Sequence, residues 1–283
     1  MLQIREWAAG GVKMNSDKLK KAIRHNSVFY MLGLLVLVSM KLFYSGAGCD
    51  QLKWLLAPTA KWVEVLSGLS FYYEPGAGCV NHGLRISIAP SCSGFRFMTI
   101  VFAMLYFSFL HRTGRPDRNG AKSFFGNLKN YLQKGCWLLT SLLLSCVLTV
   151  LVNGLRIIAA LYLPDFLGRT DLPLAFLTPD RLHTLIGILV YFMALLAIYR
   201  LAAYFFGDKA LSPVSALAKC LPPLFWYFFF TLGIPFLGRA YERKGTEFAE
   251  YALLILFGCG ILLLPHLLTF SVKKFAKTQS SRH

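Results

Sequence analysis

A cysteine, an arginine and a histidine in three separate apolar stretches could together perform nucleophilic chemistry. Cys92 lies in the sequence Pro-Ser-Cys-Ser-Gly-Phe, where a polar loop becomes an apolar run. Arg156 lies near the end of a second apolar run, and His183 begins a third. A thiolate is the reactive form of cysteine, and a neighbouring histidine or arginine favours it. A guanidinium keeps its charge and can stabilise an oxyanion, whereas an imidazole can exchange protons near neutral pH.

The elements that must position these residues are membrane helices. The chain has 283 residues, of which 56% are hydrophobic, and its mean hydropathy is +0.53. These values exclude an ordinary soluble domain and predict an all-α polytopic membrane protein with about six transmembrane helices. No cleavable signal peptide is evident in the polar, basic first 26 residues. The expected spans are residues 28–44, 94–110, 136–163, 182–201, 221–238 and 251–270.

The longest segment between expected spans, residues 46–91, contains a second type of helix. Residues 54–69 are amphipathic, and their tryptophans suit a headgroup layer. Pro58, Lys61 and Glu64 interrupt the apolar pattern, so an interfacial helix fits better than a span. Residues 76–89 alternate enough to predict a short hairpin or an extended loop.

The distribution of charge predicts the orientation in the membrane. The formal net charge is +17. Nineteen Lys and Arg residues lie on one side of the expected spans and eight on the other, and the second side carries nine of the thirteen acids. Lys and Arg are retained in the cytoplasm, so both termini are expected inside and residues 46–91, 164–182 and 239–250 outside. Because the basic excess alternates with the crossings, it favours membrane topology over nucleic-acid binding, and no nucleic-acid partner is expected.

The three reactive residues are expected at one depth. Cys92 and His183 each begin a span from the outer side. Arg156 lies 20 residues after Cys136, where its span enters from the inside. At roughly 1.5 Å per residue this is about 30 Å, the thickness of the hydrocarbon core. The alternatives without a catalytic role are that Cys92 is a packing residue and that Arg156 extends toward the outer lipid headgroups.

Helical spacing predicts which neighbours support the site. Asn153 and Arg156 are three residues apart and share a helix face, so Asn153 can brace the guanidinium. Gly187 follows His183 by four residues and allows close approach of a neighbouring helix beneath it. Arg96 lies four residues after Cys92 and is either a second cation of the site or an anchor for the helix end.

These motifs resemble the exosortase/archaeosortase family of membrane transpeptidases. The resemblance rests on Pro-Ser-Cys-Ser-Gly-Phe (90–95), Asn-Gly-Leu-Arg-Ile (153–157) and His-Thr-Leu-Ile-Gly-Ile-Leu-Val-Tyr (183–191). Leu-Ala-Pro-Thr-Ala (56–60), Val-Glu (63–64) and the glycine at 68 are similar to the K-type exosortases. The resemblance covers about residues 27–201 and implies a four-span catalytic domain there, while the pattern of charge and hydropathy predicts a basic cytoplasmic arm (1–26) and a two-span extension with a basic tail (202–283). Residues 221–270 lie outside the matched pattern.

The resemblance also implies a function. Cys92, Arg156 and His183 would be catalytic, with Ser93, Gly94, Arg96, Asn153 and Gly187 in support and no metal or organic cofactor. The enzyme would lie in the cytoplasmic membrane with its site on the extracytoplasmic face. Its substrates would be exported proteins that end in a short motif, a hydrophobic helix and a basic cluster. It would cleave at the motif through a thioester and transfer the new carboxyl end to a lipid or glycan acceptor.

Other interpretations of the same residues are weighed against this one. A non-enzymatic transporter or scaffold would use Arg156 and His183 to line a polar path. A hydrolytic intramembrane protease would use the same residues and differ only in its product.

Cys79 and His82 have metal-pair spacing, but no second pair follows, so zinc is not expected. Cys49 and Cys79 could form a disulfide outside the membrane, and the sequence leaves this open. Packing roles are expected for the remaining cysteines, Cys136, Cys146, Cys220 and Cys259.

Overall fold

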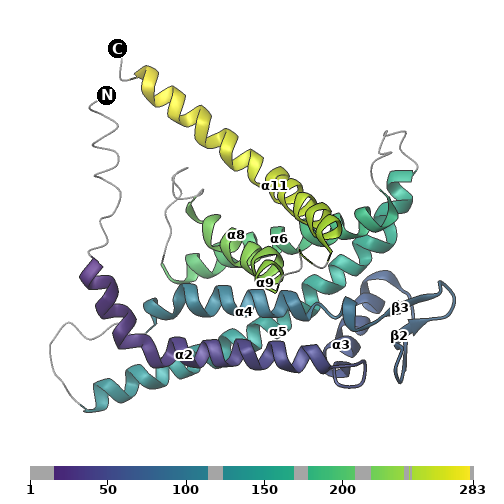
Figure 1. Cartoon of the computed structure of the whole chain (residues 1–283), viewed down its shortest axis with the longest axis horizontal. Coiled ribbons are helices and arrows are strands. Elements are labelled where there is room, and N and C mark those ends of the chain that lie inside the picture. The colour runs from purple at the N-terminus through teal and green to yellow at the C-terminus, as the bar shows by residue number, and fades with distance from the viewer. Residues whose placement is uncertain are drawn as a thin grey trace.

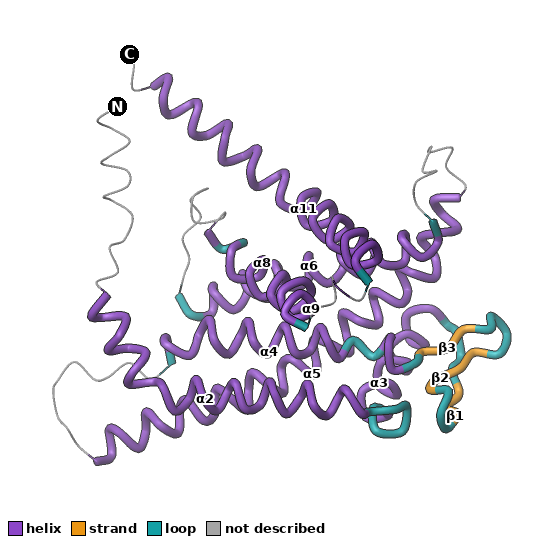
Figure 2. The backbone as a smooth tube through the Cα atoms, in the orientation of Figure 1, coloured by secondary structure: helices purple, strands orange, loops and turns teal. Residues whose placement is uncertain are grey.

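The computed structural model shows a helical membrane protein with one small β-sheet (Figures 1 and 2). It describes residues 16–113, 124–168, 178–207, 218–238, 242 and 244–280. Several charged residues behind the predicted orientation lie outside this part of the chain: Arg5, Lys13, Arg115, Asp117, Arg118, Lys122, Arg169, Asp171, Lys209, Arg239, Arg243 and Arg282.

Five helices among the described residues are long and apolar enough to cross a membrane. Their apolar parts are Asn26–Gly46, Pro90–Arg112, Leu128–Pro164, Pro179–Phe205 and Gly245–Pro265. They belong to α2 (Ser16–Gly46), α4 (Phe95–Phe109), α5 (Phe124–Gly168), α6 (Pro179–Phe205) and α11 (Gly245–Ser280). Consecutive members of this set run in opposite directions from α2 to α6 (Figure 1). Helices α2 and α5 begin at Ser16 and Phe124, which is 12 residues before each of the corresponding expected spans, 28–44 and 136–163.

The fifth expected span, 221–238, is shorter and less regular than predicted. It consists of α8 (Leu221–Phe228), one π-helical turn (η3, Phe229–Gly233) and α9 (Ile234–Leu237). Pro235 cannot donate a backbone hydrogen bond, and its ring disturbs the preceding turn. A widened π turn accommodates such a disruption. The whole segment, Leu221–Leu237, falls below the length of the other five candidate spans.

Helix α3 (Lys53–Ser67) confirms the amphipathic helix expected at 54–69. Its buried face, formed by Leu55, Leu56, Thr59, Ala60 and Val63, packs along α5. Gly68 ends the helix in the left-handed conformation, and its N–H donates to the Glu64 carbonyl at 2.8 Å.

A three-stranded antiparallel sheet follows α3, where the sequence predicted only a hairpin or a loop. Its strands are β1 (Tyr72–Glu74), β2 (Gly78–Asn81) and β3 (Ile86–Ile88), in that order. Tyr73 pairs with Cys79, and Cys79 also pairs with Ile88. Strand β1 lies before residues 76–89, the range in which the sequence alternates. A strand of three residues is too short to show an alternating pattern of its own. The fold is otherwise helical, in agreement with the expected all-α membrane protein.

Helix α4 is the centre of the helical bundle. In its apolar window 83% of the residues are buried, against 17–33% in the other four candidate spans. It is apolar on all sides, which is typical of a helix enclosed by others. Phe97, Ile100 and Met104 of α4 share a core with residues of α6, α8 and α11. The segments after residue 201 thus pack into the same core as the helices that carry the sequence motifs.

Candidate active site

The cysteine motif forms a tight turn that leads into the central helix. Residues Pro90–Cys92 make one 3₁₀ turn (η1), in which the N–H of Cys92 donates to the carbonyl of Ala89 at 2.8 Å. The hydroxyl of Ser93 is buried and accepts the N–H of Phe95 at 3.3 Å. Ser93 therefore satisfies a donor at the start of α4, and its role in this structure is to hold the turn.

Gly94 is required by both its backbone angle and its surroundings. Its φ is +74°, in the left-handed region, where a side chain is strained. A Cβ at this position would lie 2.9 Å from Cγ of Asn153 and 3.0 Å from Cγ2 of Thr149. The glycine therefore lets the turn that carries Cys92 rest directly on α5.

Asn153 links the cysteine turn to the arginine. It is fully buried, and its Nδ2 donates to the backbone carbonyl of Cys92 at 2.6 Å. Its Oδ1 accepts Nη1 of Arg156 at 3.3 Å, as the three-residue spacing predicted. The same oxygen accepts the hydroxyl of Tyr191 at 2.7 Å. One amide therefore holds groups from three helical segments.

The guanidinium of Arg156 lies between the cysteine and the histidine. Its Nη2 is 3.0 Å from Nε2 of His183, and its Nη1 donates to the hydroxyl of Tyr191 at 3.3 Å. It also interacts with the side chain of Cys92. A guanidinium can only donate, so Nε2 of His183 is the acceptor and carries no proton in this arrangement. Among the described residues, Cys92 and His183 meet Arg156 rather than each other.

Helix α6 supplies the histidine side of the site. The helix begins with Thr178, whose hydroxyl accepts the N–H of Arg181 at 3.4 Å. Arg181 also forms an ion pair with Glu250 at 3.1 Å, which joins the start of α6 to α11. A Cβ at Gly187 would lie 3.5 Å from Nε of Arg156. That distance is an ordinary van der Waals contact, so Gly187 lies directly against the arginine side chain of α5, where α5 and α6 pack together.

A cavity of about 290 Å³ opens beside these residues. Arg156, His183, Gly187 and Tyr191 line it, together with Ser91 and Gly94 on either side of the half-buried Cys92. The cavity is closed by aromatic residues from other helices: Tyr44, Tyr227 and Tyr251. Arg156 and the unprotonated nitrogen of His183 face this space, and Cys92 lies in the chain between two of its lining residues, Ser91 and Gly94. A thiol, a fixed cation and an unprotonated imidazole are the groups that acyl transfer requires.

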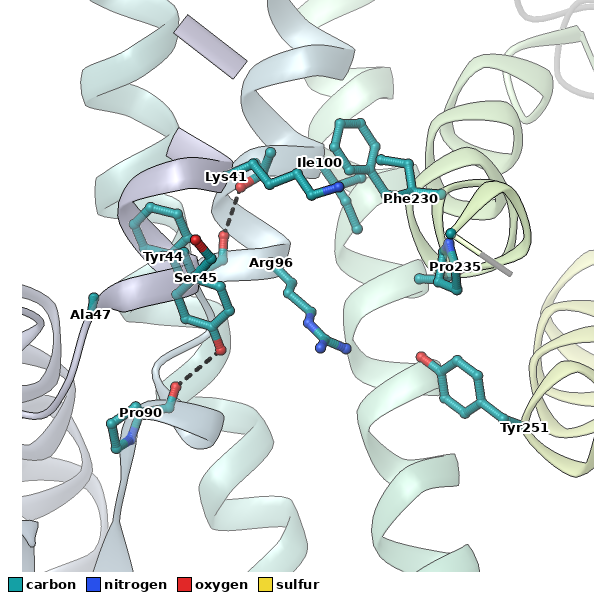
Figure 3. Close-up of a pocket in the computed structure, with 15 residues that line it drawn as sticks. Lys41, Tyr44, Ser45, Ala47, Pro90, Arg96, Ile100, Phe230, Pro235 and Tyr251 are labelled. Atoms are coloured by element: carbon teal, nitrogen blue, oxygen red, sulfur yellow. Dashed lines mark hydrogen bonds between the residues drawn. The ribbon is translucent and has the colours of Figure 1, made fainter. Parts of the chain in front are cut away.

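A second, larger cavity of about 660 Å³ adjoins the first (Figure 3). Tyr44, Phe95, Arg96 and Tyr251 line both cavities. Arg96 points into the larger one from the first turn of α4 and is exposed there (Figure 3). Arg96 was expected to be either a second cation of the site or an anchor for the helix end. In the structure it lies where the two cavities meet.

Three site residues were not predicted from the sequence. Tyr191 is the last residue of the motif at 183–191 and lies four residues after Gly187; its hydroxyl contacts both Asn153 and Arg156, and its ring stacks on Phe97 at 4.6 Å. The four-residue spacing along α6 was the available signal. Tyr227 and Tyr251 belong to the C-terminal segments, and no sequence motif marks them.

The sheet and α3 have their own polar contacts. The pKa of Glu64 is lowered, because its carboxylate accepts the N–H of Phe71 at 2.8 Å and the amine of Lys61 at 2.9 Å. Burial raises the pKa of the Cys79 thiol, with a further contribution from Glu64. Cys49 and Cys79 are both free and buried, and Cys49 Sγ donates to the carbonyl of Gly76 at 3.1 Å.

The remaining metal and cysteine expectations can be compared with the part of the chain that the structure describes. Nε2 of His82 lies 2.9 Å from Oε1 of Glu74. No group of three or more His, Cys, Asp or Glu suited to a metal ion occurs among the described residues. Cys220 and Cys259 are buried in the core, as packing residues would be, and Cys146 is half-buried. Cys136 is exposed.

Comparisons of the chain with protein-family models, with curated proteins and with solved structures find no match. The functional interpretation therefore rests on the sequence motifs and on the geometry of the site.

Proposed function

We propose that this protein is a cysteine transpeptidase of the exosortase/archaeosortase type, a multi-pass enzyme of the cytoplasmic membrane. The observation that supports it most is the position of the Arg156 guanidinium, 3.0 Å from Nε2 of His183 and 3.3 Å from Oδ1 of Asn153, whose Nδ2 donates to the carbonyl of Cys92 at 2.6 Å. Cys92, Arg156 and His183 are the residues that the family resemblance carries over as catalytic. A buried arginine in a membrane helix is costly and is retained where it has a function.

The first half of the proposed reaction forms a thioester. The sulfur of Cys92 attacks the scissile carbonyl carbon, and the carbonyl oxygen gains the negative charge. Arg156 turns one nitrogen from His183 to this oxyanion, which frees Nε2 of His183 to take the thiol proton. The carbon–nitrogen bond then breaks, and the leaving amine takes that proton from His183.

The second half resolves the thioester. The nucleophile of an acceptor, a lipid or a surface glycan, attacks the carbonyl carbon of the thioester while His183 removes its proton. Collapse of the new tetrahedral intermediate breaks the carbon–sulfur bond and returns the proton to Cys92. Water in place of the acceptor would give hydrolysis, with the same residues in the same roles.

The proposed topology has six crossings, with both termini in the cytoplasm and the site on the extracytoplasmic face. The excess of Lys and Arg on one side of the spans supports this orientation. Leu221–Leu237 is the fifth crossing in this proposal. Its 17 residues rise about 26 Å at 1.5 Å per residue, close to the hydrocarbon thickness of about 30 Å.

Such an enzyme would act on exported proteins whose C-terminal signal contains a short motif, a hydrophobic helix and a basic cluster. The test is mass spectrometry of the C-termini of exported proteins from cells that carry the parent enzyme or Cys92→Ala. Processed C-termini are expected with the parent and not with the variant. Cys136→Ala is the matched control, because Cys136 is exposed on α5 away from the site, and it should process normally.

The same experiment separates the alternative functions. A transferase leaves an acceptor mass on the new C-terminus, whereas a protease leaves a free carboxyl group. A transporter or scaffold predicts identical C-termini in both strains. Normal processing by Cys92→Ala would refute the enzyme proposal.

A further inference from the structure

The larger cavity is a groove between two groups of helices (Figure 3). One wall comes from the end of α2 and the start of α4, including Tyr44, Phe95 and Ile100. The other comes from the C-terminal segments, including Phe230 and Ile234, with Tyr251 of α11. Its volume of about 660 Å³ is in the range of sites for organic ligands, about 300–1,000 Å³. The walls are mainly apolar, as a site open to lipid requires.

Two cations enter this apolar groove. Lys41 lies five residues before the end of α2, and Arg96 lies in the first turn of α4. Both belong to helical stretches long and apolar enough to span the membrane. Among the described residues, neither has a hydrogen-bond or ion-pair partner, and no carboxylate lines the groove. The groove therefore combines apolar walls with two positive charges that none of its described lining residues neutralises.

The position of the two cations favours a shared anionic ligand over two separate headgroup contacts. Each side chain alone could reach the headgroup layer. Here both line the same groove, which holds two like charges with no carboxylate among its described lining residues. A ligand with one phosphodiester and no amine brings a net charge of −1 and lowers the charge of the groove from +2 to +1, whereas a zwitterionic ligand brings no net charge and leaves it at +2.

We propose that this groove binds an anionic phospholipid. Its phosphate lies between Lys41 and Arg96, and an acyl chain lies along the apolar wall formed by Phe230 and Ile234. The groove shares Tyr44, Phe95, Arg96 and Tyr251 with the catalytic cavity, so the headgroup lies next to it. The C-terminal segments, which lie outside the family resemblance, thereby acquire a role as one wall of a lipid site.

The test measures lipid binding without catalysis, so it does not depend on the proposed reaction. Purified Cys92→Ala protein is mixed with dioleoyl phosphatidylglycerol or dioleoyl phosphatidylcholine, and bound lipid is counted by native mass spectrometry. Phosphatidylglycerol should bind about tenfold more tightly, since contacts between a cation and a phosphate are charge-assisted. Adding Lys41→Gln and Arg96→Gln should reduce the affinity ratio to about one.

The matched control removes two charges from the same end of the molecule but outside the groove. Lys53→Gln with Lys61→Gln does this on α3, where both residues are exposed, and it should keep the tenfold preference. A second variant, Ile234→Trp, should lower the binding of both lipids because the ring fills the apolar part of the groove. The substituted residues are exposed or line a cavity, so the variants should fold. Gel filtration of each variant checks this.

Three results would overturn the proposal. The parent could bind both lipids equally, the groove variant could keep its preference, or the control variant could lose it to the same extent. A further arm adds an apolar helical peptide with one glutamate. If this peptide displaces phosphatidylglycerol from the parent at equal concentration, the groove is a polypeptide site and the lipid proposal fails.

Discussion

Substitution of Gly94 by alanine tests how the cysteine turn rests on α5. Two costs add at this position. Alanine in the left-handed conformation costs about 1–2 kcal/mol relative to glycine. Its Cβ would also lie 2.9 Å from Asn153 and 3.0 Å from Thr149, and overpacking of a filled site costs about 1–3 kcal/mol. The expected loss of folding free energy is therefore about 2–5 kcal/mol.

Gly68 provides a matched control for the backbone part of this cost. Its φ is +72°, close to the +74° of Gly94, but a Cβ there meets nothing within 4 Å. Gly68→Ala should therefore cost only the conformational part, about 1–2 kcal/mol. The difference between the two variants isolates the contact between the turn and α5.

The assay is unfolding by SDS in mixed micelles, followed by far-ultraviolet circular dichroism. Gly94→Ala should lower the unfolding free energy by about 1–3 kcal/mol more than Gly68→Ala. It should also reduce processing of exported proteins, because Asn153 would move and would no longer hold the Cys92 carbonyl. Equal effects of the two substitutions on stability would refute the packing of the turn against α5.

Further predictions concern the arginine, the tyrosine and the sheet. Arg156→Lys should lower the rate of processing about 100-fold while the protein still inserts into the membrane. The reason is that an ammonium group cannot replace a planar guanidinium that donates to several partners at once. Quantitative mass spectrometry of the C-termini measures the rate. Tyr191→Phe keeps the ring but removes the hydroxyl on Asn153, and should cost about 1 kcal/mol of stability in the SDS assay. The lowered pKa of Glu64 means that its contribution to stability is present above the ordinary glutamate value, about 4.3, and is lost as the pH falls through its folded-state pKa. Glu64→Gln should therefore flatten the dependence of stability on acidic pH, and an unchanged pH profile would contradict the contact with Phe71.

The spans were predictable where the apolar pattern was long and uninterrupted. Five of the six expected stretches correspond to helices of sufficient length and hydropathy. Composition shows that a stretch is apolar, but it does not show whether lipid or protein covers it. The central place of α4 depends on its neighbours and became visible only in the packing. The π turn at Phe229–Gly233 involves only five residues, so the apolar pattern does not reveal it. Pro235, which follows the turn, is the residue whose type indicates a disturbed helix there.

The candidate site was predictable where residues share a helix and less so where helices meet. The brace between Asn153 and Arg156 follows from a spacing of three and is confirmed. The order in which Arg156 lies between Cys92 and His183 depends on how α4, α5 and α6 pack, which spacing within each helix does not determine. Tyr251 enters the site from α11, more than 150 residues after Cys92 in the sequence. No local pattern connects the two.

The most direct test of the central claim is to detect the acyl group on Cys92. Membranes of cells that carry the parent enzyme are quenched in acid, which preserves a thioester, and digested, and the peptide that contains Cys92 is measured by mass spectrometry. The account predicts that this peptide carries a C-terminal fragment of an exported protein, and that hydroxylamine releases it. An unmodified Cys92 peptide in cells whose exported proteins are nevertheless processed would contradict the account.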